Sequence, residues 1–160
     1  MRADVLSDTG VITISAVASA TANEIDVNTS RNSRISTSGS ITVEGRGPGT
    51  EYLGSLVLSS PNAIVIRGDR PDINSGFVFT SSPVVTLESF GASFSATVAT
   101  TNLTAGSATR GLRIGKTTNT SAVTLGSSMT VNGPIEVYGS DISLTNKPSL
   151  VVSSQSARLL

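Results

Sequence analysis

Cysteine and histidine are both missing from this chain of 160 residues. Without thiols it forms no disulfide bond and no thiolate metal site. Without imidazoles it builds neither a Ser-His nor a Cys-His catalytic pair. Carboxylate chemistry remains open, and Asp69 and Asp72 lie close in sequence, but beside Pro71 and without the aromatic partners that sugar cleavage usually needs. We interpret both as loop polarity and expect no enzyme activity, no cofactor and no metal.

Tryptophan is absent too, and aromatic residues make up only 4% of the chain. A globular core normally relies on large aromatics, whereas the narrow interior of a solenoid is filled by aliphatic and small residues. The formal net charge is zero, with 11 basic and 11 acidic residues, so no overall field attracts nucleic acid or an anionic membrane. No apolar run approaches about eighteen residues, so we expect no membrane insertion.

What the chain does have is a series of very short apolar triplets between residues 111 and 152. Most place a polar residue between two apolar ones, which is the period-2 pattern of a strand with one buried face. From the second triplet on, steps of six to eight residues leave about three residues of strand and three or four of corner. The triplets are Leu112-Arg113-Ile114, Val123-Thr124-Leu125, Met129-Thr130-Val131, Ile135-Glu136-Val137, Ile142-Ser143-Leu144 and Leu150-Val151-Val152.

Three such segments make a coil of roughly twenty residues, and stacked coils make a parallel β-helix. The sequence therefore predicts an all-β fold, a right-handed parallel β-helix (solenoid) of about seven or eight coils. We expect a single domain over residues 1–160, with irregular coils in 1–104 and the most regular coils in 105–153. Because the chain starts without a signal peptide and stops just after a triplet, we expect it to be a fragment of a longer chain. A β-sandwich is the alternative, mainly because the first half is irregular.

Alternation along each strand also predicts which side chains point inward and which point outward. The outward position is apolar at Val57, Val65 and Val78, and apolar residues on an outer surface need a cover. We expect segment 45–52 or segment 67–76 to fold over them. The residues expected to point inward are Val11, Ile14, Ile41, Val43, Ile114, Val123, Leu125, Ile135 and Val137.

Arg67-Gly68-Asp69 is the one short motif that could carry recognition. It follows a predicted strand and precedes Arg70 and Pro71, so we expect it on an exposed loop, as integrin-type recognition of this tripeptide requires. A chance match is expected on the order of a few per cent of the time. A charged turn containing Gly is also typical of solenoid corners, so a purely structural role is the competing interpretation.

Gly115-Lys116-Thr117 is similar to the end of a phosphate-binding loop. Arg110 occupies the position where that motif needs a Gly, and no helix is predicted to follow. We interpret this segment as a corner of the solenoid with a solvent-facing Lys116.

The most regular stretch resembles the repeat region of filamentous-haemagglutinin-like exoproteins, large bacterial adhesins of the two-partner secretion pathway. The resemblance rests on residues 111–126 and 131–142, is good over about 105–145, and is only stylistic over 1–100. It implies a right-handed β-helix from the shaft of a secreted or surface-exposed protein. The family's amino-terminal secretion domain and its Asn-Pro-containing motifs are not present. No functional residue of the family maps onto this chain, apart from the tripeptide that some members display.

We therefore expect a non-enzymatic structural shaft segment of a bacterial adhesin, secreted or at the cell surface, whose partners are neighbouring coils of a longer parent chain. The alternative is a receptor- or carbohydrate-binding module that uses the 67–76 loop or the Val57, Val65 and Val78 surface, with a host-cell receptor or glycan as its partner. A third reading, a carbohydrate-active β-helix enzyme, would need a cleft of carboxylates and aromatics. Two Tyr and four Phe are few for sugar stacking, which counts against both sugar readings.

Overall fold

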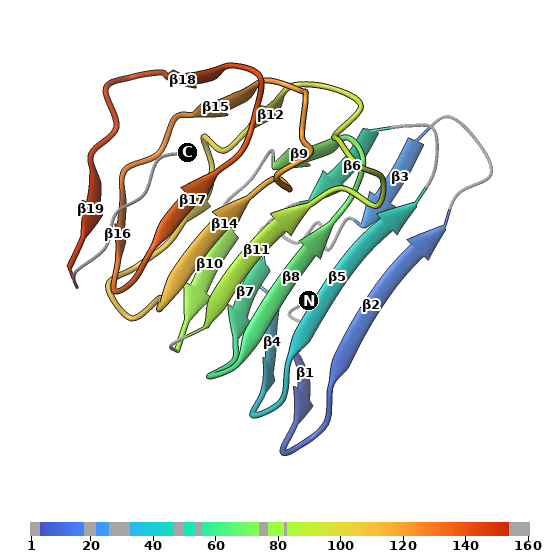
Figure 1. The fold of residues 1–160 in the computed structure, drawn as a ribbon. Coiled ribbons are helices and arrows are strands. Elements are labelled where there is room, and N and C mark those ends of the chain that lie inside the picture. The colour runs from blue at the N-terminus through green and yellow to red at the C-terminus, as the bar shows by residue number, and fades with distance from the viewer. Residues whose placement is uncertain are drawn as a thin grey trace.

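The computed structural model describes residues 4–17, 22–25, 33–46, 50–53, 56–73, 77–81 and 83–153. Over these residues the chain forms nineteen short strands and no helix. Every strand pair among them is parallel, and neighbouring strands are three apart in chain order. Figure 1 shows a chain that winds repeatedly around three sides, so that strands stack along one axis. The fold is an all-β solenoid, as the sequence predicts.

Six strands form the largest side, which we call the long sheet: β2 (Ile12–Val17), β5 (Ile41–Arg46), β8 (Ala63–Arg67), β11 (Val84–Glu88), β14 (Gly111–Ile114) and β17 (Ile135–Val137). A second side holds β1 (Asp4–Ser7), β4 (Ser33–Thr37), β7 (Leu56–Ser59), β10 (Phe77–Thr80) and β13 (Leu103–Thr104). It continues into β16 (Met129–Val131) and β19 (Leu150–Val152), because the Thr130 amide donates to the carbonyl of Ala105, just after β13.

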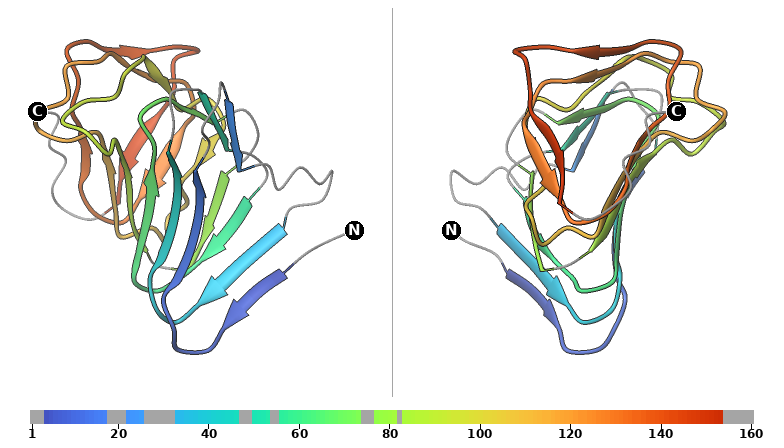
Figure 2. Two further views of the ribbon diagram at one scale, coloured as in Figure 1. Left: turned by 90° about the vertical axis from the view of Figure 1, so that its right-hand side faces the viewer. Right: turned by 60° about the vertical axis from the view of Figure 1, so that its left-hand side comes forward.

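The third side is formed by two three-stranded sheets in sequence. The first contains β3 (Ala22–Ile25), β6 (Thr50–Leu53) and β9 (Pro71–Ile73), and the second contains β12 (Val98–Ala99), β15 (Val123–Leu125) and β18 (Ile142–Leu144). The two turned views in Figure 2 show the three sides enclosing a common interior. Each coil thus contributes one strand to each side.

The chain forms fewer coils than the seven or eight expected, and each coil is longer than the expected length of about twenty residues. In the long sheet the paired positions run Ile12, Ile41, Ile64, Val85, Leu112 and Ile135, so successive coils take 29, 23, 21, 27 and 23 residues. The expected coil length of about twenty residues assumed that every corner is short. Segments 89–97 and 115–122, which follow β11 and β14, are corners of nine and eight residues and lengthen their coils. The β-sandwich alternative is wrong, since sandwiches are built from antiparallel sheets.

Aliphatic side chains from all three sides fill the interior. Of the nine residues expected to point inward, seven are buried: Ile41, Val43, Ile114, Val123, Leu125, Ile135 and Val137. Ile14 is half-buried against the same core. Val11 is 70% exposed, so that expectation is wrong. The pairing of Ile12 with buried Ile41 puts residues 12 and 14 inward, and the alternation therefore turns residue 11 outward.

The three valines expected on one outer surface do not share a surface. Val57 and Val78 pair with each other on the second side, whereas Val65 lies in the long sheet between Thr42 and Thr86. All three are half-buried. Parts of the segments expected to cover them form strands instead, since residues 50–52 lie in β6 and residues 71–73 form β9. Residues 47–49 and 74–76 of these segments lie outside the described part of the chain. The described residues therefore show no single apolar surface of the kind that the sequence suggested.

At one corner of the solenoid, small polar residues form a column in which each coil is hydrogen-bonded to the next. Between the second side and the long sheet, the Ser60 hydroxyl donates to the Gly39 carbonyl at 2.6 Å. The Asn62 amide donates to the Ser38 carbonyl at 2.6 Å, and Ser38 in turn donates to the carbonyl of Asp8. These side chains satisfy corner carbonyls that the sheets leave unpaired. The Ser-rich corners thus hold successive coils in register.

Both ends of the stack leave inner positions partly uncovered. Val5 pairs with buried Ile35 yet is itself 46% exposed. At the other end, Leu144 pairs with buried Leu125 yet is 56% exposed. Among the described strands, each lies in the outermost one of its sheet, β1 or β18, so a described strand covers it from one side only.

Candidate functional site

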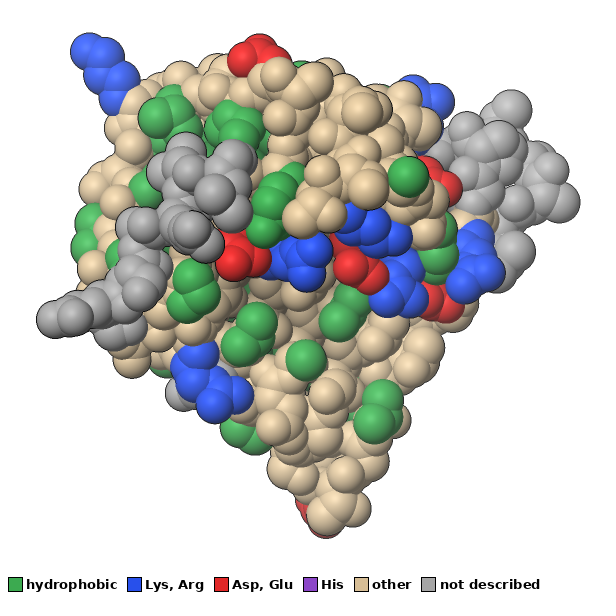
Figure 3. All heavy atoms as spheres, viewed as in Figure 1, with side chains coloured by type: hydrophobic (Ala, Val, Ile, Leu, Met, Phe, Trp, Pro, Cys, Tyr) green, Lys and Arg blue, Asp and Glu red, His purple; other side chains and the backbone are tan. Residues whose placement is uncertain are grey.

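A band of charged side chains crosses the outer face of the long sheet (Figure 3). Its centre is Arg67, the last residue of β8, which stands in register between Glu44 of β5 and Glu88 of β11. The Arg67 guanidinium donates to Oε1 of Glu88 from Nη2 at 2.6 Å and from Nε at 2.9 Å. Oε2 of Glu44 lies 3.7 Å from Nη1. The three charges form one ladder across three coils.

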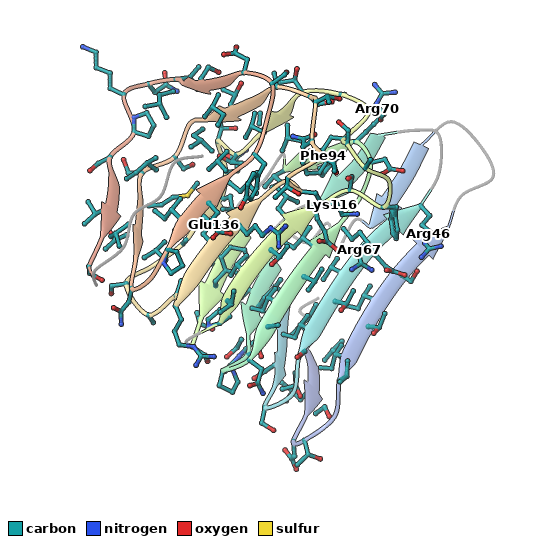
Figure 4. The ribbon with its side chains drawn as sticks, viewed as in Figure 1. Arg46, Arg67, Arg70, Phe94, Lys116 and Glu136 are labelled. Carbon is teal, nitrogen blue, oxygen red and sulfur yellow. The ribbon has the colours of Figure 1, made fainter. Side chains whose placement is uncertain are left out.

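Phe90 packs against the positive end of this band. The guanidinium carbon of Arg46 lies 4.3 Å from the ring centroid, and that of Arg67 lies 5.7 Å away. Both distances fall within the range of a cation–π interaction. Arg46 ends β5 and Phe90 follows β11, so segment 89–97 reaches back over two earlier coils. Figure 4 shows Arg46, Arg67 and Lys116 in this region, with Glu136 farther along the long sheet.

Asp69 anchors the beginning of segment 89–97. Its Oδ1 accepts hydrogen bonds from the backbone amides of Phe90 at 2.9 Å and Gly91 at 3.3 Å. Its backbone carbonyl accepts from the amide of Ser95 at 2.7 Å. From the following coil, Lys116 Nζ donates to the carbonyls of Phe90 and Gly91 at 3.2 and 2.8 Å. The same turn is therefore held from both neighbouring coils.

The far end of segment 89–97 is held by Asn119, a buried residue that sequence reasoning did not single out. Its Oδ1 accepts from the amides of Phe94 and Ser121, both at 3.2 Å. Its Nδ2 donates to the Tyr138 carbonyl at 2.7 Å. One amide side chain thus joins three successive coils. The sequence marks Asn119 only as the start of an Asn-Thr-Ser tripeptide, and it does not reveal these partners, because they are brought together only by the winding of the chain.

The Arg67-Gly68-Asp69 tripeptide does not lie on an exposed loop, so that premise is wrong. Arg67 belongs to β8 and its side chain is only 33% exposed, Gly68 is buried, and the Asp69 carboxylate is hydrogen-bonded to the next coil. A strand follows at once, since β9 begins at Pro71. These contacts give each residue a structural role. A role of the tripeptide in binding stays a prediction.

Lys116 and Asp72 are two further residues that the sequence analysis singled out. Lys116 was expected to face solvent, but it bonds the turn at Phe90, so its role is structural. Asp72 lies in β9, and its side chain falls outside the described part. Within the described residues, no three His, Cys, Asp or Glu side chains gather closely enough to hold a metal ion. In that same part of the chain, no helix is long and apolar enough to cross a membrane.

A second group of polar residues lies farther along the long sheet. Arg113 of β14 stands in register with Glu136 of β17, and its guanidinium carbon is 5.5 Å from the Tyr138 ring centroid. The Tyr138 hydroxyl lies 3.5 Å from a Glu136 carboxylate oxygen. The Nε of Arg113 is buried and has no hydrogen-bond partner. Together with the ladder around Arg67, the group of Arg113, Glu136 and Tyr138 gives the outer face of the long sheet both positive and negative side chains. Arg46, Arg67 and Arg113 each lie close to a carboxylate or an aromatic ring.

No protein-family model, no curated protein and no solved structure matches this chain. The functional argument therefore rests on the geometry of the chain itself.

Proposed function

We propose that this chain is a non-enzymatic structural shaft segment of a secreted or surface-exposed bacterial adhesin of the filamentous-haemagglutinin-like, two-partner-secretion type. Its partners would be neighbouring coils of a longer parent chain, and its part in adhesion would be to hold a binding tip away from the cell. We also infer the right-handed sense of the coil, because parallel strands are almost always joined by right-handed connections.

One observation carries the proposal: the distinctive polar side chains bond one coil to the next. Arg67, Asp69, Lys116 and Asn119 each find their partners on coils above or below their own. In a binding site, polar groups converge on a shared space and leave bonding capacity for a ligand. Side chains that are instead satisfied along the stack stiffen a rod. This use of polar residues favours a mechanical role.

The competing function is a receptor- or carbohydrate-binding module that uses the 67–76 loop. Its support is the tripeptide itself, together with the partial exposure of Arg67 and the exposure of Arg70. Integrin-type recognition depends on the Asp carboxylate. Asp69→Asn separates the two functions, because the Asn side chain keeps an Oδ1 that can accept from the Phe90 and Gly91 amides while the negative charge is removed.

The test is attachment of mammalian cells to surfaces coated with the native chain or with Asp69→Asn. An established attachment protein serves as the positive control, and circular dichroism verifies equal β content. A shaft predicts background attachment to both coatings. Attachment to the native chain that is lost in Asp69→Asn would overturn the shaft proposal in favour of the binding module.

A further inference from the structure

The corner between β16 and β17 consists of Asn132, Gly133 and Pro134. It stacks on the corner that precedes β14 in the preceding coil. The Asn132 amide donates to the Thr109 carbonyl at 2.7 Å. Two residues later, the Pro134 carbonyl accepts from the Leu112 amide at 2.9 Å. The backbone is therefore held in place on both sides of Gly133.

Position 133 requires glycine because the chain passes very close to the preceding coil there. A Cβ atom on residue 133 would lie 1.7 Å from the carbonyl oxygen of Arg110. That oxygen belongs to the backbone of a stacked coil, so it cannot swing aside as the end of a flexible side chain could. The fold thus places a glycine directly after Asn132, and this is the only Asn-Gly pair in the sequence.

The groups of this pair that could react with each other are not held by other partners. Asn132 is exposed, and among the described residues nothing is hydrogen-bonded to its side-chain amide. The backbone amide of Gly133 likewise has no acceptor in the described part of the chain. By contrast, the side-chain amides of Asn62, Asn102 and Asn119 each donate to a backbone carbonyl. The Asn132 side chain is therefore free to turn toward the Gly133 nitrogen.

We propose that Asn132 is a site of spontaneous deamidation through a cyclic imide. Hydroxide removes the proton from the Gly133 nitrogen, which attacks Cγ of Asn132. The bond from Cγ to the side-chain nitrogen breaks, and ammonia leaves with a proton from water. Water then opens the five-membered imide at either carbonyl, giving aspartate or isoaspartate. The net change is hydrolysis of a single amide by water, with no oxidant or reductant.

Glycine is the residue that best permits this ring to close. It has no Cβ atom to collide with the closing ring, and its backbone reaches conformations that other residues avoid. The close approach to Arg110 that excludes every other residue at position 133 therefore also makes Asn132 reactive. The reactivity is a by-product of how tightly this corner stacks.

The two products are expected to change the corner differently. Either one adds a negative charge, since carboxyl groups are ionised at neutral pH. Isoaspartate also leads the main chain through the former side chain and so adds a carbon atom to the backbone. Hydrogen bonds hold the backbone on both sides of Gly133, so the added length has no room. We therefore expect isoaspartate to weaken the pairing of β17 with β14, whereas aspartate leaves it intact.

The test is ageing of the folded chain in mildly alkaline buffer, with circular dichroism to verify that it stays folded. Peptide mapping by mass spectrometry measures the conversion of amide to acid at each asparagine, and an isoaspartate-specific methyltransferase labels the isoaspartate. The internal control is Asn146, which is also exposed but is followed by Lys147. The matched variant is Asn132→Ala, which removes the site.

Asn132 is expected to convert several-fold faster than Asn146, at a rate that rises with pH because hydroxide starts the reaction. Anion exchange then separates the aged chains by their added charge. The isoaspartate fraction should unfold at a lower urea concentration than unaged chain. Asn132→Asp, which reproduces the other product, should keep the stability of the native chain, and aged Asn132→Ala should show neither the added charge nor the loss of stability.

Gly133 is buried, so the rate in the folded chain is compared with the rate in the same chain unfolded in urea. Conversion of Asn132 in urea, with none in the folded chain beyond that of Asn146, would overturn the inference and show that the corner protects the pair. Equal stability of the isoaspartate fraction and the unaged chain would overturn the predicted effect on β17. The inference does not rest on the adhesin proposal, and cell attachment does not bear on it.

Discussion

Asn119 shows how much of this fold depends on single side chains that bridge coils. Its amide satisfies backbone groups of Phe94, Ser121 and Tyr138 and is almost fully buried. A buried backbone group that loses its partner costs about 1–3 kcal/mol. The residue therefore stabilises segment 89–97 and the coil after it together, although it lies in a corner and belongs to no strand.

We predict that Asn119→Ala lowers the free energy of unfolding by about 2–3 kcal/mol, because several buried backbone groups lose their partners together. Urea denaturation followed by circular dichroism measures the change. Asn132→Ala is the matched control, since Asn132 is exposed in a corner of the same part of the chain, and we expect it to change stability by less than about 0.5 kcal/mol. Equal effects of the two substitutions would contradict the bridging role of Asn119.

At this scale the sequence revealed residue types but not their partners. The absence of Cys and His, and the inward direction of seven aliphatic residues, could be read directly. The roles of Asp69 and Lys116 could not, because their partners at Phe90 and Gly91 lie 21 to 26 residues away in sequence. The separation equals about one coil, and coil length was the quantity that the sequence left open.

Among the elements, β5, β8 and β11 form a unit joined by charge as well as by backbone bonds. Arg67 pairs closely with Glu88, at 2.6 Å, and more distantly with Glu44, at 3.7 Å. All three side chains are partly exposed, so each pair is screened by solvent and contributes modestly. The asymmetry in distance means that the two glutamates do not contribute equally.

Glu88→Gln is expected to destabilise the chain by about 1 kcal/mol, and Glu44→Gln by only about 0.3 kcal/mol, because the closer pair gains more from opposite charge. The difference should shrink in about 1 M NaCl, where the Debye length is near 3 Å. Chemical denaturation in urea at two salt concentrations makes the comparison. A larger loss of unfolding free energy for Glu44→Gln would show that Glu44, and not Glu88, is the stronger partner of Arg67.

The sequence predicted the elements well where apolar triplets were regular. All six triplets between residues 112 and 152 lie in strands β14 to β19. The corners between them were harder to predict, because a corner of four residues and a corner of nine carry the same signals of Gly, Ser and Asn. The charged ladder was missed for the same reason, since its members meet only when coil length is known.

On the scale of the whole molecule, the stack behaves as a one-dimensional array in which each coil contacts only its neighbours. The end coils have one neighbour each and the inner coils have two. The exposure of Val5 and Leu144 is the visible sign of this difference. Loss of structure is therefore expected to start at the ends and to proceed inward.

Pulling the chain by its two termini should unwind it one coil at a time. The coils measured along the long sheet contain 21 to 29 residues, so each released coil adds about 70 to 105 Å at 3.3–3.6 Å per residue. Single-molecule force spectroscopy on the chain between two handles measures these steps. A single release of the full contour length would show instead that the coils unfold as one cooperative unit.

The unequal coil lengths show how the sequence of such a solenoid can change during evolution. Strands in the stack keep a spacing near 4.8 Å whether a coil holds 21 residues or 29. Extra residues therefore widen the outline, as segment 89–97 does, and add nothing along the axis. The reach of the rod is counted in coils, while its profile is free to vary at the corners. Insertions at the corners thus change the outline of the solenoid without altering its length along the axis.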